Sequence, residues 1–199
     1  MSDSTVHLLV IDGFADWEPA YALAGLRHWG GLGVRTVGMT RDPVTTMGGL
    51  RVLPETTLAD MHADRDAVRL FMLPGGDVWE KGYPAEQIEP KLRELAEAGV
   101  PIAAICGATI AAARAGLLRG RRHTSNTPTY LTEFAAGSTS PDDFVDELAV
   151  RDRGVITASG LGAVDFAREI FAELEAFPPP VIESFVDMYK HGRIPRAMA

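Results

Sequence analysis

The stretch Val100-Pro-Ile-Ala-Ala-Ile-Cys106-Gly-Ala-Thr-Ile-Ala-Ala-Ala-Arg-Ala-Gly116 decides the fold of this chain. Its apolar part, Ile102 to Ile105, is typical of a strand that is buried on both faces of a sheet. The run of small residues from Gly107 to Ala115 then indicates a helix. The stretch therefore predicts a strand, a sharp turn and a helix, with Cys106 at the turn.

Cys106 is the only cysteine among the 199 residues. A lone cysteine is commonly no more than a small buried hydrophobe. The strand–turn–helix context favours a nucleophile, because in such an elbow the reactive side chain projects above the edge of the sheet. The N-terminus of the following helix offers unpaired N–H groups and partial positive charge, which favour a thiolate. Cys106 is therefore the candidate nucleophile.

Strands and helices alternate along the rest of the chain. Strands are predicted at Val6–Ile11, Val34–Met39, Val68–Leu73, Phe144–Val150 and Val155–Ala158, and a hairpin or edge strand at Thr46–Leu53. Helices are predicted at Trp17–Trp29, Ala85–Ala98, Gly162–Leu174 and Val181–Lys190. This alternation argues for an α/β fold in which helices cover both faces of a mostly parallel sheet. The absence of linkers and repeats predicts one domain over residues 1–199.

Composition excludes several classes of function. The formal net charge of −8 argues against a general nucleic-acid or acidic-membrane surface. The apolar runs are too short to span a bilayer, and the N-terminus lacks the features of a signal peptide. A single cysteine fits a reducing compartment, so we expect a cytoplasmic protein. The histidines have no metal-ligand spacing, and we expect neither a metal nor a cofactor.

Three loops, one of which holds Cys106 itself, should meet at one edge of the sheet, because sites in open parallel sheets form outside the carboxyl ends of the strands. The first loop carries Asp16, the expected cap of the helix at Trp17, and Glu18. Glu18 is either an ordinary first-turn carboxylate or a partner of the thiol. In the second case like-charge repulsion requires that one of the two groups keep a proton.

The second loop carries Gly75 and Gly76, whose N–H groups could form an oxyanion hole, although a tight turn explains them equally well. His123 follows the predicted elbow helix and is the candidate base that assists Cys106. A structural histidine is at least as common in such a position.

Together these residues resemble the ThiJ/PfpI (DJ-one) superfamily, within the class I glutamine-amidotransferase-like fold. The matching pieces, in the order and spacing of that family, are Leu8-Leu-Val-Ile-Asp-Gly-Phe-Ala-Asp-Trp-Glu18, Leu73-Pro-Gly-Gly76, Ala103-Ala-Ile-Cys-Gly-Ala-Thr109 and Thr157-Ala-Ser-Gly160. The resemblance implies a flavodoxin-like three-layer sandwich, usually a homodimer, with Cys106 as the reactive thiol. It also implies that Glu18 is a protonated carboxyl in contact with the thiol, and that Gly76 and Gly107 supply oxyanion N–H groups.

The sequence departs from better-known members at two positions. Protease-like members carry a histidine where this chain has Gly107, which argues against intracellular protease activity. Members related to the deglycase carry a histidine where this chain has Asn126. No synthetase domain accompanies the resemblance, which argues against ammonia transfer.

The leading hypothesis is a cysteine-dependent hydrolase or glyoxalase-like enzyme that acts on a small carbonyl or amide substrate. The alternative is a redox-sensing stress protein in which the cysteine is oxidised to sulfinic acid without turnover. A third hypothesis is a binding or regulatory module that has the same fold as these enzymes.

Overall fold

The computed structural model describes residues 5–63 and 67–194. A seven-stranded sheet with the order β5-β2-β1-β6-β7-β9-β8 forms its centre. The strands are β1 (Thr5–Leu9), β2 (Gly33–Gly38), β5 (Thr56–Thr57), β6 (Val68–Leu73), β7 (Ile102–Ile105), β8 (Ala149–Asp152) and β9 (Val155–Ala158). All neighbouring strands run parallel except β8 and β9, which form an antiparallel hairpin at one edge. The mostly parallel sheet is therefore confirmed.

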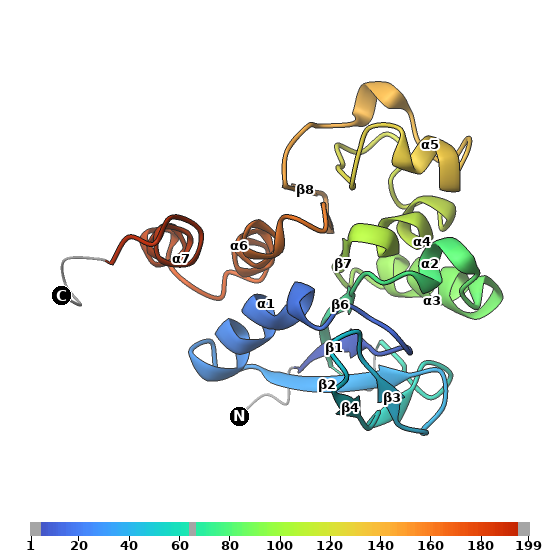
Figure 1. Cartoon of the computed structure of the whole chain (residues 1–199), viewed down its shortest axis with the longest axis horizontal. Helices are drawn as coiled ribbons and strands as arrows, with labels where there is room; N and C mark the ends of the chain where they lie inside the picture. The colour runs from blue at the N-terminus through green and yellow to red at the C-terminus, as the bar shows by residue number, and fades with distance from the viewer. Residues whose placement is uncertain (1–4, 64–66, 195–199) are drawn as a thin grey trace.

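Helices cover both faces of this sheet, which confirms the three-layer sandwich (Figure 1). One face carries α1 (Trp17–His28), α6 (Ala163–Glu173) and α7 (Pro179–His191). The other face carries α2 (Val78–Lys81), α3 (Ala85–Glu97), α4 (Thr109–Arg114) and α5 (Tyr130–Phe134). A separate two-stranded hairpin forms from β3 (Val44–Thr45) and β4 (Arg51–Val52). Of the two alternatives predicted around Thr46–Leu53, a hairpin or an edge strand, the hairpin is therefore confirmed.

The central strands are apolar because they are buried on both faces. Phe71 of β6, Ile102 of β7 and Ile156 of β9 are completely buried. Burying a side chain of this size stabilises the fold by about 1.5–3 kcal/mol. The continuous apolar runs of the sequence therefore mark the middle of the sheet, and this core holds the ends of the strands in place.

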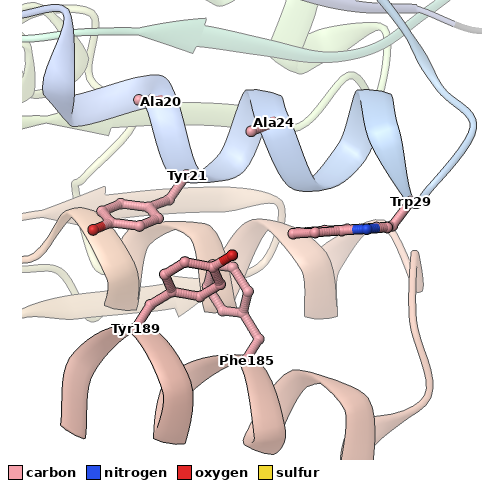
Figure 2. A pocket seen from close by; sticks show the side chains of 6 residues that line it. All are labelled: Ala20, Tyr21, Ala24, Trp29, Phe185 and Tyr189. Atoms are coloured by element: carbon pink, nitrogen blue, oxygen red, sulfur yellow. The ribbon is translucent and has the colours of Figure 1, made fainter. Parts of the chain in front are cut away.

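Helix α7 packs on α6 and reaches the outer side of α1 with two aromatic rings (Figure 2). The ring of Tyr21 meets the rings of Phe185 and Tyr189 edge-on, with centroids 6.2 and 5.3 Å apart. A shallow hollow of about 250 Å³ remains beside them, lined by Ala20, Tyr21, Ala24, Trp29, Phe185 and Tyr189. The hollow lies on the outer face of α1.

The structure corrects several expectations about local elements. Asp16 does not cap α1 with its side chain; its carboxylate accepts a hydrogen bond from the Thr46 hydroxyl at 2.7 Å. The predicted strand at Phe144–Val150 becomes regular only at Ala149, and Phe144 makes an isolated bridge with His123. Helix α7 begins at Pro179, two residues before its predicted start, because prolines fit the first turn of a helix. The short elements β5 and α2 were not predicted.

Candidate active site

Four loops converge at the carboxyl ends of strands β1, β6, β7 and β9, which are neighbours in the sheet. Glu18 lies in the first turn of α1, which follows β1. Gly75 follows β6, Cys106 follows β7 directly, and Gly160 lies two residues after β9. The sequence predicts that three loops meet at this edge of the sheet. The structure adds a fourth loop, which carries Gly160.

Cys106 lies at a strained elbow between β7 and α4. Its φ is +58°, a left-handed conformation that costs a residue with a side chain about 1–2 kcal/mol. A short 3-10 turn, Cys106–Ala108, precedes α4. The Thr109 hydroxyl donates to the Cys106 carbonyl at 2.6 Å, and the Ser125 hydroxyl lies 2.7 Å from that of Thr109. These buried hydroxyls hold the elbow in its strained conformation.

Three glycines leave room for the thiol. A Cβ atom at Gly75 would lie 2.6 Å from Cys106 Cβ and 2.6 Å from Glu18 Oε2. A Cβ atom at Gly160 would lie 3.0 Å from Cys106 Sγ, and one at Gly107 would lie 3.0 Å from Cδ1 of the buried Trp79. Gly75 is therefore restricted to glycine by its approach to Cys106 and Glu18, whereas a side chain at Gly160 or Gly107 would require its neighbours to shift by a few tenths of an ångström.

Glu18 is the buried carboxyl of the site, with a relative exposure of 2%. Its Oε2 atom accepts a hydrogen bond from the Gly75 N–H at 2.5 Å, and its carboxyl is hydrogen-bonded to Cys106. Burial raises the pKa of Glu18 to about 7, against the opposing effect of these two hydrogen bonds. Glu18 can therefore both accept and return a proton near neutral pH.

Burial also raises the pKa of the Cys106 thiol to about 11, and the charge of Glu18 adds to this effect. Hydrogen bonds from the Asn126 side chain and the Gly107 N–H act in the opposite direction. The helix N-terminus alone predicts a lowered pKa, but desolvation outweighs it here. The structure therefore favours a resting thiol, with Glu18 positioned to take its proton, over a preformed thiolate.

Asn126 contacts the sulfur with its side-chain amide. Its Nδ2 atom donates to Cys106 Sγ at 3.4 Å, and its Oδ1 atom accepts from the Gly160 N–H at 3.0 Å. Nearby, the Tyr130 hydroxyl donates to Glu80 Oε1 at 2.5 Å, and burial followed by this bond raises the pKa of Tyr130 above its ordinary value. In the sequence, Asn126 stands out only as a departure from related proteins. No sequence pattern assigns a role to Gly160 or Tyr130.

His123 is not brought to the thiol. Its ring is buried, with Nδ1 2.8 Å from the Arg121 carbonyl oxygen and its plane nearly perpendicular to the ring of Phe144. Within residues 5–63 and 67–194, none of the recorded interactions of His123 involves Cys106 or Glu18. These contacts fit the structural reading of this histidine, which holds the start of the segment that carries Asn126.

The three glycines predicted to form an oxyanion hole differ in which partner their backbone faces. The Gly107 N–H points to the Cys106 sulfur. The Gly75 N–H already donates to Glu18 and so is not available to a substrate. Gly76 has a φ of +147°, and a Cβ there would lie 2.8 Å from the Gly13 carbonyl oxygen. Gly75 therefore orients the carboxyl, while Gly107 and Gly76 remain candidates for the oxyanion.

The described residues contain neither a cluster of metal ligands nor a membrane-spanning helix. No group of three or more His, Cys, Asp or Glu side chains there could hold a metal ion. No helix there is both long enough and apolar enough to cross a membrane.

Comparison with known proteins places this geometry among related chains. The model of the DJ-1/PfpI family matches residues 4–173. The uncharacterized protease YoaZ of Bacillus subtilis is 32% identical over 197 residues, covering 96% of this chain and 92% of that protein. The deglycase TK1284 of Thermococcus kodakarensis is 32% identical over 120 residues, covering 60% of this chain and 70% of that protein.

Solved structures agree with the same relationship. The DJ-1 superfamily protein Atu0886 from Agrobacterium tumefaciens superimposes with a TM-score of 0.86 at 30% identity, covering 96% of this chain and all of that one. The thiJ/pfpI family protein from Bacillus anthracis has a TM-score of 0.85 at 30% identity, covering 97% of this chain and 93% of that one. These neighbours are consistent with the flavodoxin-like α/β sandwich expected from the sequence.

Proposed function

The chain belongs to the DJ-1/PfpI family, and on this premise we propose that it is an enzyme whose Cys106 attacks the electrophilic carbon of a small carbonyl or amide substrate. The contact between the buried carboxyl of Glu18 and the elbow thiol carries the proposal. Relatives named as a protease and as a deglycase make hydrolase-like chemistry plausible for this site.

The proposed reaction begins with proton transfer from the Cys106 thiol to the Glu18 carboxylate. The sulfur forms a bond to the substrate carbon while the carbonyl π electrons move onto oxygen, where the Gly107 and Gly76 N–H groups would donate hydrogen bonds. Glu18 then returns the proton, either to the new alkoxide or to the leaving group of an amide. A pKa of about 7 suits Glu18 to both steps.

Redox sensing remains the second candidate for the same thiol. The sequence has no second cysteine that could resolve a sulfenic acid, so oxidation would proceed towards sulfinic acid. The thiolate is the species that peroxide attacks, and a thiol pKa of about 11 leaves little of it at neutral pH. The same limit applies to attack on a carbonyl, so we place catalytic turnover first on another ground, the relatives named as a protease and as a deglycase.

A homodimer is part of the proposal. The β3–β4 hairpin is held against the loop before α1, because the Thr45 N–H donates to Asp12 and the Met47 N–H to the Phe14 carbonyl, both at 2.8 Å. Large apolar side chains are exposed on these adjoining segments: Trp17 (50%), Met47 (46%) and Leu50 (62%). We propose that a second copy of the chain covers this hairpin patch, defined as Trp17, Met47 and Leu50.

Turnover of a panel of small aldehydes, 2-oxoaldehydes and primary amides tests the proposed chemistry. The wild-type protein should consume at least one of these classes, and Cys106→Ser should lose about a thousandfold or more of that rate, because a serine hydroxyl ionises far less readily than a thiol. A Cys106→Ser variant as fast as the wild type, or no consumption of any class, would overturn the proposal.

A further inference from the structure

We infer that the Asn126 carboxamide is the side-chain donor to the reacting Cys106 sulfur and, in the proposed reaction, to the oxygen of the carbonyl under attack. The second half of this inference rests on the proposed function. The first half concerns the free protein and can be tested without a substrate.

The orientation of the carboxamide follows from its partners. The Gly160 N–H can only donate, so the atom 3.0 Å from it must be the carboxamide oxygen of Asn126. The NH₂ group therefore faces the other way, where its nitrogen lies 3.4 Å from Cys106 Sγ. A flip of the amide would place an N–H against another N–H and an oxygen against the sulfur. The Cys106 sulfur therefore faces the NH₂ group of Asn126, which is a hydrogen-bond donor.

The segment that carries Asn126 is fixed in place by its neighbours in sequence. The Thr124 N–H donates to the Thr157 hydroxyl at 2.9 Å, and the Thr124 hydroxyl donates to the Glu147 carbonyl at 2.7 Å. Ser125 is hydrogen-bonded to Thr109 at 2.7 Å, and these residues are all buried except Glu147. The carboxamide is therefore already in position before a substrate arrives, which is the condition for effective electrostatic stabilisation.

Charge develops on the sulfur as its proton moves to Glu18. Two donors oppose the cost of that charge in this half-buried site, the Gly107 N–H and the Asn126 side chain. When the sulfur bonds to a carbonyl carbon, the electron pair of the C=O bond moves to an oxygen only two bonds away from the sulfur. An amide in contact with the sulfur can reach that oxygen with one of its two N–H bonds. Asn126 carries no titratable proton, so Glu18 alone moves protons in this scheme.

A purely structural role would be to tie the loop at Gly160 to the segment before α5. The Asn126→Asp variant places a negative charge beside the sulfur, while it keeps the acceptor for the Gly160 N–H and loses the donor to the sulfur. Asn126→Ala removes both. Thr127→Ala is the matched control, since Thr127 is the exposed next residue and its hydroxyl lies 3.3 Å from that of Thr129, away from the site.

The rate of alkylation by iodoacetamide between pH 6 and pH 11 measures the ionisation of the single thiol. Asn126→Asp should react about tenfold or more slowly than the wild type at pH 8, with its midpoint moved to higher pH, because the donor is lost and a carboxylate faces the thiolate. Asn126→Ala should move in the same direction by less, and Thr127→Ala should match the wild type. An Asn126→Ala profile identical to the wild type, or moved to lower pH as a merely loosened and more exposed thiol would be, would overturn the inference.

A second measurement needs no variant at this position. Asn126 is the only asparagine in the chain, so protein labelled with ¹⁵N-asparagine gives one side-chain amide signal. That signal should shift as the site titrates and again when Cys106 is alkylated, and an unmoved signal would contradict a contact with the sulfur. A failure of the proposed enzyme activity leaves both readouts intact, so the two failures are distinguishable.

Discussion

At the scale of single residues, Glu18 makes the stability of the whole protein depend on pH. Burial raises its pKa from 4.5 to about 7. Between these values the unfolded chain releases a proton that the folded chain keeps, so stability falls as the pH rises, by about 3 kcal/mol in all. Glu18→Gln keeps an acceptor for the Gly75 N–H but cannot ionise, so its stability should be nearly flat over this range. Urea unfolding at pH 5 and pH 8 measures the difference.

The control for this experiment is Glu86→Gln, because Glu86 is an exposed carboxylate in the first turn of α3. It should keep the pH dependence of the wild type. Equal slopes for the wild type and Glu18→Gln would show that the Glu18 carboxyl is ionised in the folded protein at both pH values.

The residues of the site differ in how far the sequence could predict them. Cys106 and Glu18 were found because each follows a strongly apolar strand, and topology brings the ends of such strands together. Asn126 was not assigned to the site because its segment is held by side-chain bonds rather than by a regular strand, so no periodic pattern marks it. His123, three residues earlier, has the more familiar catalytic side chain but points its ring at Arg121 and Phe144.

At the scale of elements, α7 is joined to α6 by a partly buried ion pair. The Lys190 ammonium lies 2.7 and 2.9 Å from the two carboxylate oxygens of Asp165, which is 4% exposed. Lys190→Ala should destabilise the protein by about 1–2 kcal/mol, less than for a fully buried pair, because Lys190 is partly exposed and Arg168 still lies 3.4 Å from Asp165. Amide exchange in α7 should rise with the loss of stability measured in urea.

Lys81→Ala supplies the comparison for this variant. Its ion pair with Asp77 is 2.8 Å long, but the two side chains are 73% and 71% exposed. Water and salt screen such a pair, so the variant should lose much less stability than Lys190→Ala. If both variants lost the same stability, burial of Asp165 would not be the reason for the effect.

Elements with a long apolar pattern were predicted well, and short elements were not. The bounds of β6 and β7 agree with the prediction because buried strands of a parallel sheet are apolar throughout. Strand β5 and helix α2 have 2 and 4 residues, too few for a period to be visible. Asp16 was assigned as a cap from its residue type, yet a tertiary contact with Thr46 determines its conformation.

At the scale of the whole molecule, the hairpin patch predicts an assembly of two chains. Sedimentation equilibrium at micromolar concentration should give a dimer for the wild type. Leu50→Asp should give a monomer, because a carboxylate buried in an apolar interface would lose its water without gaining a partner. Ile194→Asp, at a position 71% exposed and outside the patch, should remain a dimer. A wild-type monomer, or a Leu50→Asp dimer, would contradict the proposed interface.

The four-loop construction of the site also has a consequence for the newly made chain. Glu18, Gly75 and Cys106 leave the ribosome well before Asn126 and Gly160, and β9 follows β7 by about fifty residues. At about 5–20 residues per second, several seconds pass before the last loop exists. Until then the loop at Gly160 does not cover the thiol, so we expect its pKa to lie closer to the ordinary value of a cysteine. The nascent protein is therefore more open to alkylation and oxidation than the finished one, and quick pairing of β9 with β7 protects its only sulfhydryl.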